Sequence, residues 1–263
     1  MKKKQMITTA AAAVLAFTAL SGAAVTYAAD SSEYTSNGAV KFIPNTDPTP
    51  PVNPLDPDPG KPVEPVDPTD PDGPNPGTDG PLSIDYASSL DFGLNKISNK
   101  DETYFARAQT YKGDTPASAN YVQVSDNRGN NGGWVLKVKQ NGQFKAATTT
   151  LNDTLTGAAI TLDKPTVASN STATAPVAEK PITLKPDGTE SVVLSAAKNA
   201  GAGTWVDRWG TVETVTEKDA DGKDVQAEVT KDVSLFVPGS TPKDAVNYKT
   251  TLTWNLSDIP ENV

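Results

Sequence analysis

The segment that decides the fold class is residues 133–144, which read GWVLKVKQNGQF. Trp134, Leu136 and Val138 share one face of an extended strand and the residues between them share the other, because side chains alternate across a strand. The Asn-Gly pair that follows tolerates the positive φ angles of a two-residue hairpin turn. We therefore predict a strand here that turns at Asn-Gly into a second strand over 144–147.

Short runs of the same kind recur outward from this segment, separated by clusters of Gly, Asn, Asp and Pro as expected for turns. Many short strands indicate an all-β fold, a single sandwich or barrel-like domain of short antiparallel strands over residues 82–263. Residues 164–180 are poor in aromatics, and we predict a long surface loop there. The predicted strands are 82–92, 103–109, 121–125, 134–139, 144–147, 159–162, 182–184, 192–197, 204–209, 212–216, 225–229, 234–237 and 248–256.

Residues 44–81 differ sharply in composition from the rest of the chain. They hold 14 of the 22 prolines, and eight acidic residues against one lysine. Proline fixes φ and removes a backbone donor, so neither a helix nor a central strand is expected. We predict a disordered loop or a semi-rigid spacer, whose reach at about 3.1 Å per residue is on the order of 110 Å.

Residues 29–43 form an N-terminal segment before this tract. It contains GAVKFI at 38–43, whose alternation predicts a short strand. We expect this strand to pair within the main domain, which would leave the proline tract as a loop bulging from it.

The first 28 residues are typical of a secretory signal peptide. Three lysines at positions 2–4 precede an alanine-rich apolar run, and small residues lead to a cleavage site after Ala28. The run is shorter than the about 20 apolar residues that cross a bilayer, and no later segment is apolar enough to do so. We therefore predict a secreted chain with no direct membrane insertion after cleavage.

The composition excludes several classes of function. The chain has no cysteine and no histidine, which removes disulfides, Ser-His-Asp and Cys-His catalysis and histidine-containing zinc sites. The formal net charge is −9, and loss of residues 1–28 leaves 20 basic against 32 acidic residues. This balance argues against nucleic acid and against anionic surfaces as the main partner.

The segment at 248–256, YKTTLTWNL, repeats the pattern of the opening one, with Trp254 and Leu256 on one face. Two interpretations of the paired Trp-x-Leu residues stay open. They could form core, since a buried tryptophan removes on the order of 200 Å² from water. They could instead be exposed and stack on sugar rings. We favour core, because a leucine accompanies each indole on its face.

These two segments resemble the signature motifs of the WxL domain, a family of wall-associated surface proteins of Gram-positive bacteria. The first motif is GWVL at 133–136 and the second is YKTTLTWNLSDIP at 248–260. Shorter matches in the same order are LSID at 82–85, LDFG at 90–93, DNRG at 126–129 and GAGTW at 201–205. The resemblance covers essentially the whole chain after the signal peptide.

The resemblance implies a secreted protein of the cell wall and cell surface that attaches non-covalently to peptidoglycan through its C-terminal domain. It also implies a surface complex with other cell-surface proteins, including membrane-anchored WxL-interacting proteins. The wall-binding signature that it carries is Trp134, Leu136, Trp254 and Leu256, as contacts or as core. We find no Leu-Pro-x-Thr-Gly signal, apolar tail or lipobox cysteine, so we expect the folded domain itself to provide retention.

Polar contacts have candidates too. Arg128, with Lys137 and Lys139 nearby, could bind a carboxylate of the peptide stem, since a guanidinium binds carboxylates in a bidentate way. The alternative, which we favour for the loop at 126–133, is an Asp126–Arg128 pair that only connects strands.

Three aspartates at 219, 221 and 224 lie in a Gly-containing turn but lack the spacing of a helix-loop-helix calcium site. We predict a hairpin tip there, and no metal or cofactor anywhere in the chain. The most consistent function is a wall-binding module rather than an enzyme, with no catalytic residues. The alternative is a structural adaptor that binds a membrane-anchored surface protein and reaches the wall only through it. A carboxylate-dependent wall hydrolase is the least favoured function.

Overall fold

Strands and no helix make up the regular structure of residues 32–258, which the computed structural model of the chain describes. The strands are β1 (Leu82–Ala87), β2 (Glu102–Arg107), β3 (Tyr121–Asp126), β4 (Trp134–Gln140), β5 (Lys145–Ala146), β6 (Ala159–Leu162), β7 (Pro165–Ala168), β8 (Val177–Ala178), β9 (Ile182–Thr183), β10 (Ser191–Ala196), β11 (Gly203–Trp209), β12 (Val212–Lys218), β13 (Asp224–Val237), β14 (Tyr248–Lys249) and β15 (Leu252–Ser257).

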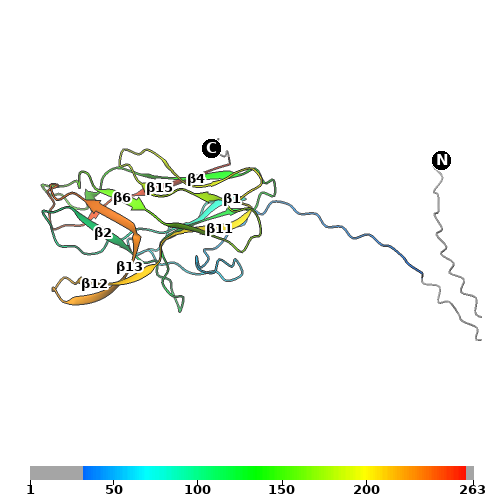
Figure 1. Cartoon of the computed structure of the whole chain (residues 1–263), viewed down its shortest axis with the longest axis horizontal. Coiled ribbons are helices and arrows are strands. Elements are labelled where there is room, and N and C mark those ends of the chain that lie inside the picture. The colour runs from blue at the N-terminus through cyan, green and yellow to red at the C-terminus, as the bar shows by residue number, and fades with distance from the viewer. Residues whose placement is uncertain (1–31, 259–263) are drawn as a thin grey trace, which may run out of the picture. The chain divides into compact units, whose positions relative to one another are not determined.

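The strands form four antiparallel sheets within the compact unit that begins at Phe42 (Figure 1). Two four-stranded sheets have the orders β1-β3-β11-β7 and β15-β4-β10-β8. A five-stranded sheet has the order β12-β13-β6-β9, with β2 also paired to β13, and β14 pairs with β5. No sheet closes on itself, so the all-β prediction is confirmed as a sandwich-like fold rather than a barrel.

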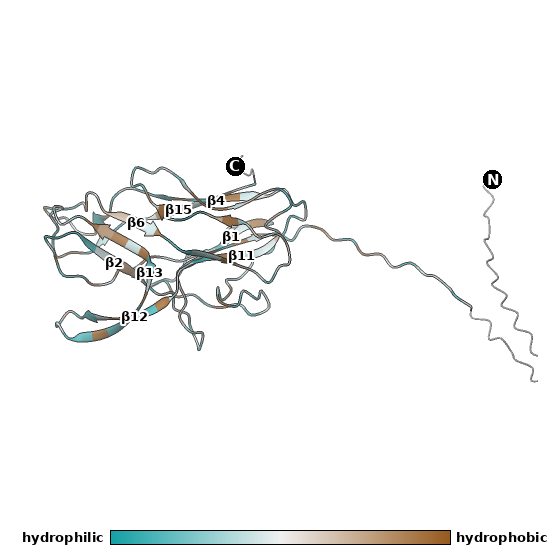
Figure 2. Ribbon diagram, viewed as in Figure 1, coloured by the Kyte–Doolittle hydropathy of each residue, from teal (hydrophilic) through white to brown (hydrophobic). Residues whose placement is uncertain are grey.

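One hydrophobic core unites the sheets. It includes Trp134 and Leu136 from β4, Trp205 and Trp209 from β11, and Leu194 from β10, all at most 4% exposed. Figure 2 shows the apolar residues concentrated on these packed strands, while most connecting loops are hydrophilic. In the strands that supply this core, the predicted alternation thus places the apolar face between the sheets.

The Asn-Gly pair does not form the predicted hairpin. Strand β4 pairs with β15 and strand β5 pairs with β14, so the two pairs form one long, interrupted antiparallel ribbon. Gly142 has a positive φ of 99°, but Asn141 donates its backbone N–H to Thr251 O at 2.9 Å, and its side chain to the hydroxyls of Thr251 and Thr253. The prediction was wrong because a strand more than 100 residues away competes for the same backbone groups.

The segment at 164–180, predicted as a long loop, contains two short strands. Pro165–Ala168 pairs with β11 and Val177–Ala178 pairs with β10, so each adds an edge to one of the four-stranded sheets. The hairpin predicted around the three aspartates is confirmed: β12 pairs with the first half of β13 from Val212↔Thr230 to Lys218↔Asp224.

The proline tract is not a disordered spacer. Residues 45–69, which we call the proline strap, cross the outer face of the sheet β1-β3-β11-β7. Val52 is completely buried there in a small cluster with Tyr86, Tyr121 and Val206. All six residues of β3 are buried as a result, because one face meets the core and the other meets the strap.

The strap is attached through a buried polar network. Gln123 accepts the backbone N–H of Val52 at 2.8 Å and donates to Pro50 O at 3.0 Å. It also donates to the carboxylate of Asp85, which accepts from Ser125 and Ser83 as well. Burial raises the pKa of Asp85, and these hydrogen bonds partly offset the rise. Proline's stiffness prevents regular structure in the strap, but its carbonyls and its valine still bind a sheet.

The strand predicted at 38–43 is absent. Residues 38–43 have no regular structure, and Val40, Phe42 and Ile43 are 78%, 85% and 80% exposed. Alternation gave this segment the pattern of a strand, but no strand edge within residues 32–258 pairs with it. The predicted signal peptide and its cleavage site lie outside the described residues.

Candidate functional site

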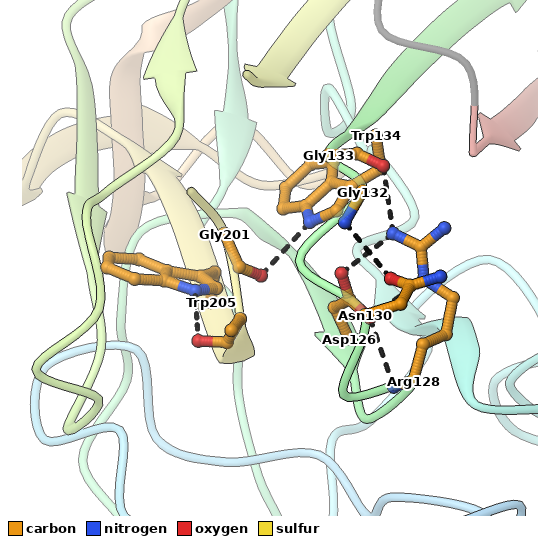
Figure 3. Close-up of polar contacts among 9 residues, drawn as sticks. Asp126, Arg128, Asn130, Gly132, Gly133, Trp134, Gly201 and Trp205 are labelled. Atoms are coloured by element: carbon orange, nitrogen blue, oxygen red, sulfur yellow. Dashed lines mark hydrogen bonds and ion pairs between the residues drawn. The ribbon is translucent and has the colours of Figure 1, made fainter. Parts of the chain in front are cut away.

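Trp134 is a core residue at the start of β4. Its indole is fully buried, and Nε1 donates a hydrogen bond to Gly201 O at 3.0 Å (Figure 3). Gly201 has a φ of 76°, and a Cβ added there would lie 2.5 Å from Trp134 Nε1. Gly201 therefore leaves the space that the Trp134 indole occupies in the core.

The two Trp-x-Leu segments are neighbouring strands of one sheet. In the β4–β15 register, Leu256 lies opposite Leu136 and Trp254 opposite Val138. The apolar side chains of both strands consequently share the inner face. Two segments separated by more than 100 residues in sequence are thus a single structural unit.

Trp254 and Leu256 are only partly buried, since β15 is the edge strand of its sheet. The Trp254 ring stacks on Trp209 of the facing sheet, with centroids 6.1 Å apart and an interplanar angle of 26°. The second motif therefore joins the two sheets along an open edge, whereas the first lies in the closed interior.

Arg128 orders the loop that leads into β4. Its Nε donates to Asp126 Oδ1 at 2.9 Å, and its Nη2 donates to Asp126 Oδ2 and to Gly133 O, both at 2.8 Å (Figure 3). Hydrogen bonding to Asp126 raises the pKa of Arg128. The Asp126 side chain is only 2% exposed and that of Arg128 12%. The predicted loop-stabilising pair is present, and the guanidinium is mostly committed to it.

Lys137 and Lys139 lie on the outer face of the sheet β15-β4-β10-β8, and both are half-buried. The register places them opposite Asn255 and Thr253 of β15. Arg128 is not part of this face, because it belongs to the loop at the end of the strands. The three basic residues therefore occupy two adjoining regions rather than one cluster.

A hollow of about 530 Å³ connects these two regions. Arg128 lines it together with Asn255 and Ser257 of β15, and with Asp79 after the strap. We call it the charged hollow; its remaining lining residues are Gly80, Pro81, Leu82, Leu256 and Asp258. Sequence reasoning missed Asp79, since nothing in the proline tract indicates that it returns to β15. It also missed Asn255 and Ser257, which the strand alternation could have placed beside Lys137.

Within residues 32–258, no group of three or more acidic residues is placed to hold a metal ion. Asp219 instead closes the β12–β13 turn, where its carboxylate accepts the backbone N–H groups of Asp221 and Lys223. The same part of the chain contains no helix long and apolar enough to cross a bilayer.

Residues 29–260 match one family model, described as the WxL domain, surface cell wall-binding. The chain belongs to the WxL family. No curated protein and no solved structure shows significant similarity to it. This WxL protein is accordingly a cell-surface protein with a wall-binding domain. The two WxL motifs are the β4 and β15 segments. The indole of Trp134 is buried in the core, and the indole of Trp254 stacks on Trp209.

Proposed function

We propose that this protein holds non-covalently to peptidoglycan through the polar side of its paired motif strands. The observation that supports the proposal is that the two faces of the β4–β15 strand pair differ in polarity. Its tryptophans and leucines pack inward, while Lys137, Lys139 and Asn255 are directed outward. Residues that bind a hydrated polymer must reach solvent, and these do.

The proposed contact surface runs from this outer face into the charged hollow. Hydroxyl and amide groups of Thr253 and Asn255 suit sugar hydroxyls, and the two lysines suit carboxylates of the peptide stems. Arg128 keeps the loop at the end of the surface rigid, which limits the entropy lost on binding. Trp134, Leu136, Trp254 and Leu256 act as the support that holds both strands in register.

Sedimentation with sacculi stripped of teichoic acid tests the proposal. The folded protein is expected to bind saturably, and Lys137→Ala/Lys139→Ala to bind about tenfold more weakly, equivalent to about 1.4 kcal/mol. Lys96→Ala/Lys223→Ala removes the same charge from exposed positions outside this sheet and is expected to bind as the parent does. A folded parent protein that stays in the supernatant would exclude direct attachment.

A second candidate function is that of an adaptor that reaches the wall through a membrane-anchored surface protein. The exposed apolar segment at 38–43 favours it, since an apolar segment without regular structure can become a strand by adding to the sheet edge of another protein. In a complete surface complex both contacts would operate together. Binding to cells that lack membrane-anchored WxL-interacting proteins distinguishes the two, because only direct attachment survives there.

We assign binding rather than catalysis to this protein. The charged hollow contains two carboxylates, Asp79 and Asp258, but both belong to exposed residues of an open surface. A glycosidase acid needs an environment that keeps it protonated, typically an apolar pocket. A zymogram with embedded sacculi is expected to show no clearing, and a cleared band at the protein's mass would contradict this assignment.

A further inference from the structure

A second hollow lies on the other side of the Arg128 loop. It has a volume of about 390 Å³ and forms where the proline strap meets the first residues of β11. We call it the amide hollow. Its lining residues are Asn45, Pro48, Thr49, Pro50, Pro59, Asn127, Asn170, Ser171, Gly203 and Thr204, none of which carries a charge.

The strap that forms one wall is fixed in place. The backbone N–H of Asn45 donates to Asn127 O at 3.3 Å, and Pro50 O accepts from the buried side chain of Gln123 at 3.0 Å. Val52 anchors the next turn of the strap in its apolar cluster. The hollow is therefore a feature of the folded domain, with walls from the strap, from β11 and from two loops.

Three side-chain amides of this lining are available to a ligand. Within residues 32–258, the amides of Asn127 and Asn170 make no hydrogen bond to protein, and Asn45 uses only its oxygen, which accepts from Asp47 N. Two of the three lining hydroxyls are engaged: Thr204 is bonded to Ser125 at 2.8 Å and Ser171 donates to Ala202 O at 2.9 Å. The unused hydrogen-bonding capacity of the hollow therefore lies in the three amides and the hydroxyl of Thr49.

This chemistry selects a class of ligand. Each amide presents donors and an acceptor together, which matches sugar hydroxyls and, most fully, an acetamido group with its own N–H and C=O. The three proline rings provide apolar surface for the C–H face of a sugar. No cation in the lining compensates an anionic ligand, and a charge left without a partner there would be unfavourable.

We infer that the amide hollow binds a neutral N-acetylated sugar. The inference rests on the proposed function, and it specifies which part of the wall polymer binds in this hollow. Peptidoglycan combines neutral N-acetylated sugars with charged peptide stems. Asn127 and Arg128 are consecutive residues, so the amide hollow and the charged hollow flank one loop. A glycan strand in the first would direct its peptide toward the second.

Titration with a soluble β-1,4-linked tetramer of N-acetylglucosamine, followed by calorimetry or by amide chemical shifts, tests the inference. Saturable binding is expected, with shifts at Asn127 and Asn170. The matching glucose tetramer, which lacks the acetamido groups, is expected to bind at least tenfold more weakly. Equal affinity for both, or no binding of the acetylated tetramer, would overturn the assignment.

Asn127→Ala/Asn170→Ala is expected to lower the affinity for the acetylated tetramer about tenfold. Neither substitution removes a side-chain hydrogen bond to protein, and the backbone hydrogen bonds of Asn127 to Pro81 and Asn45 stay in place, so the fold is expected to survive. Asn247→Ala removes an exposed asparagine remote from the hollow and is expected to change nothing. Undiminished binding by the double variant would place the sugar elsewhere.

Sacculus binding separates this inference from the proposed function. A parent that binds sacculi but ignores the tetramer retains the function and loses the inference. A parent that binds the tetramer but leaves sacculi untouched retains the inference and loses the proposed wall contact.

Discussion

A carboxyl group in the middle of the core makes this domain's stability depend on pH. Asp207 lies on β11 between Trp205 and Trp209, on the same inward face, and is completely buried. Neither of its oxygens has a hydrogen-bond partner of good geometry among the described residues. Burial therefore raises its pKa to about 8, and the nearby Thr166 backbone offsets only part of that rise.

The sign of this pH dependence follows from which state of the protein binds the proton more tightly. In the unfolded chain the carboxyl loses its proton near pH 3.8, whereas in the folded domain it keeps the proton to about pH 8. The stabilising contribution of the bound proton is complete below the unfolded pKa and is lost as the pH rises through the folded one. A difference of about four pKa units at 1.36 kcal/mol each is roughly 5–6 kcal/mol between the two limits. About 4 kcal/mol of this is lost by pH 7.

Asp207→Asn removes the titration while it keeps the shape of the side chain. Urea unfolding of both proteins at several pH values between 4.5 and 8.5 gives the difference in their free energies of unfolding. That difference cancels the other titrating groups, such as Asp85, whose pKa is raised, and Asp244, whose pKa is lowered by hydrogen bonds. The variant is expected to gain several kcal/mol on the parent as the pH rises. Parallel pH profiles would refute a buried, protonated Asp207.

Four further predictions concern single side chains. Trp134→Ala is expected to cost about 3–5 kcal/mol of unfolding free energy in urea titrations, because it empties a closed core site. Trp254→Ala is expected to cost less, about 1–3 kcal/mol, because its edge strand is already half open; equal losses would contradict this ranking. Val52→Ala is expected to release the proline strap, seen as faster proteolysis within the strap while the sandwich stays intact. Arg128→Lys is expected to lower the melting temperature by a few degrees, since lysine loses the bidentate geometry.

The fold class was predictable because alternation is a local property. The run at 134–139 and the runs at 204–209 and 212–216 formed strands nearly as expected, and the apolar faces of the first two meet in the core. The failures have a common cause. Asn141 and the segment 38–43 both carried correct local signals, but pairing depends on which distant edge competes, and that is invisible in a single segment.

The proline tract shows the same limit from another side. Its prolines do exclude regular structure, and the tract contains only isolated bridges such as Val52↔Pro62. Composition cannot reveal that one valine and a few carbonyls fit the outer face of β3. Strand β3 gave no hint either, because Gln123 and Ser125 alternate with Val122 and Val124 as in a strand with one solvent face, although all six residues are buried.

At the candidate site, strand parity correctly put Lys137 and Lys139 opposite the indole of Trp134. Sequence alone could not rank the two tryptophans, because the same Trp-x-Leu pattern surrounds both, whereas only Trp134 is fully buried. The ranking depends on β15 being an edge strand, which is a property of the whole sheet. The amide hollow was beyond reach for a similar reason, since its lining comes from four separate segments.

The pairing between β4 and β15 limits which parts of this domain can be transferred to a fusion protein. A display fusion trimmed to the C-terminal motif would lack Leu136 and Val138, the cross-strand neighbours of Leu256 and Trp254. Shifting either strand by a single residue would turn its indole toward water. A portable wall-targeting cassette must therefore include everything from the proline strap through β15, transplanted as one block.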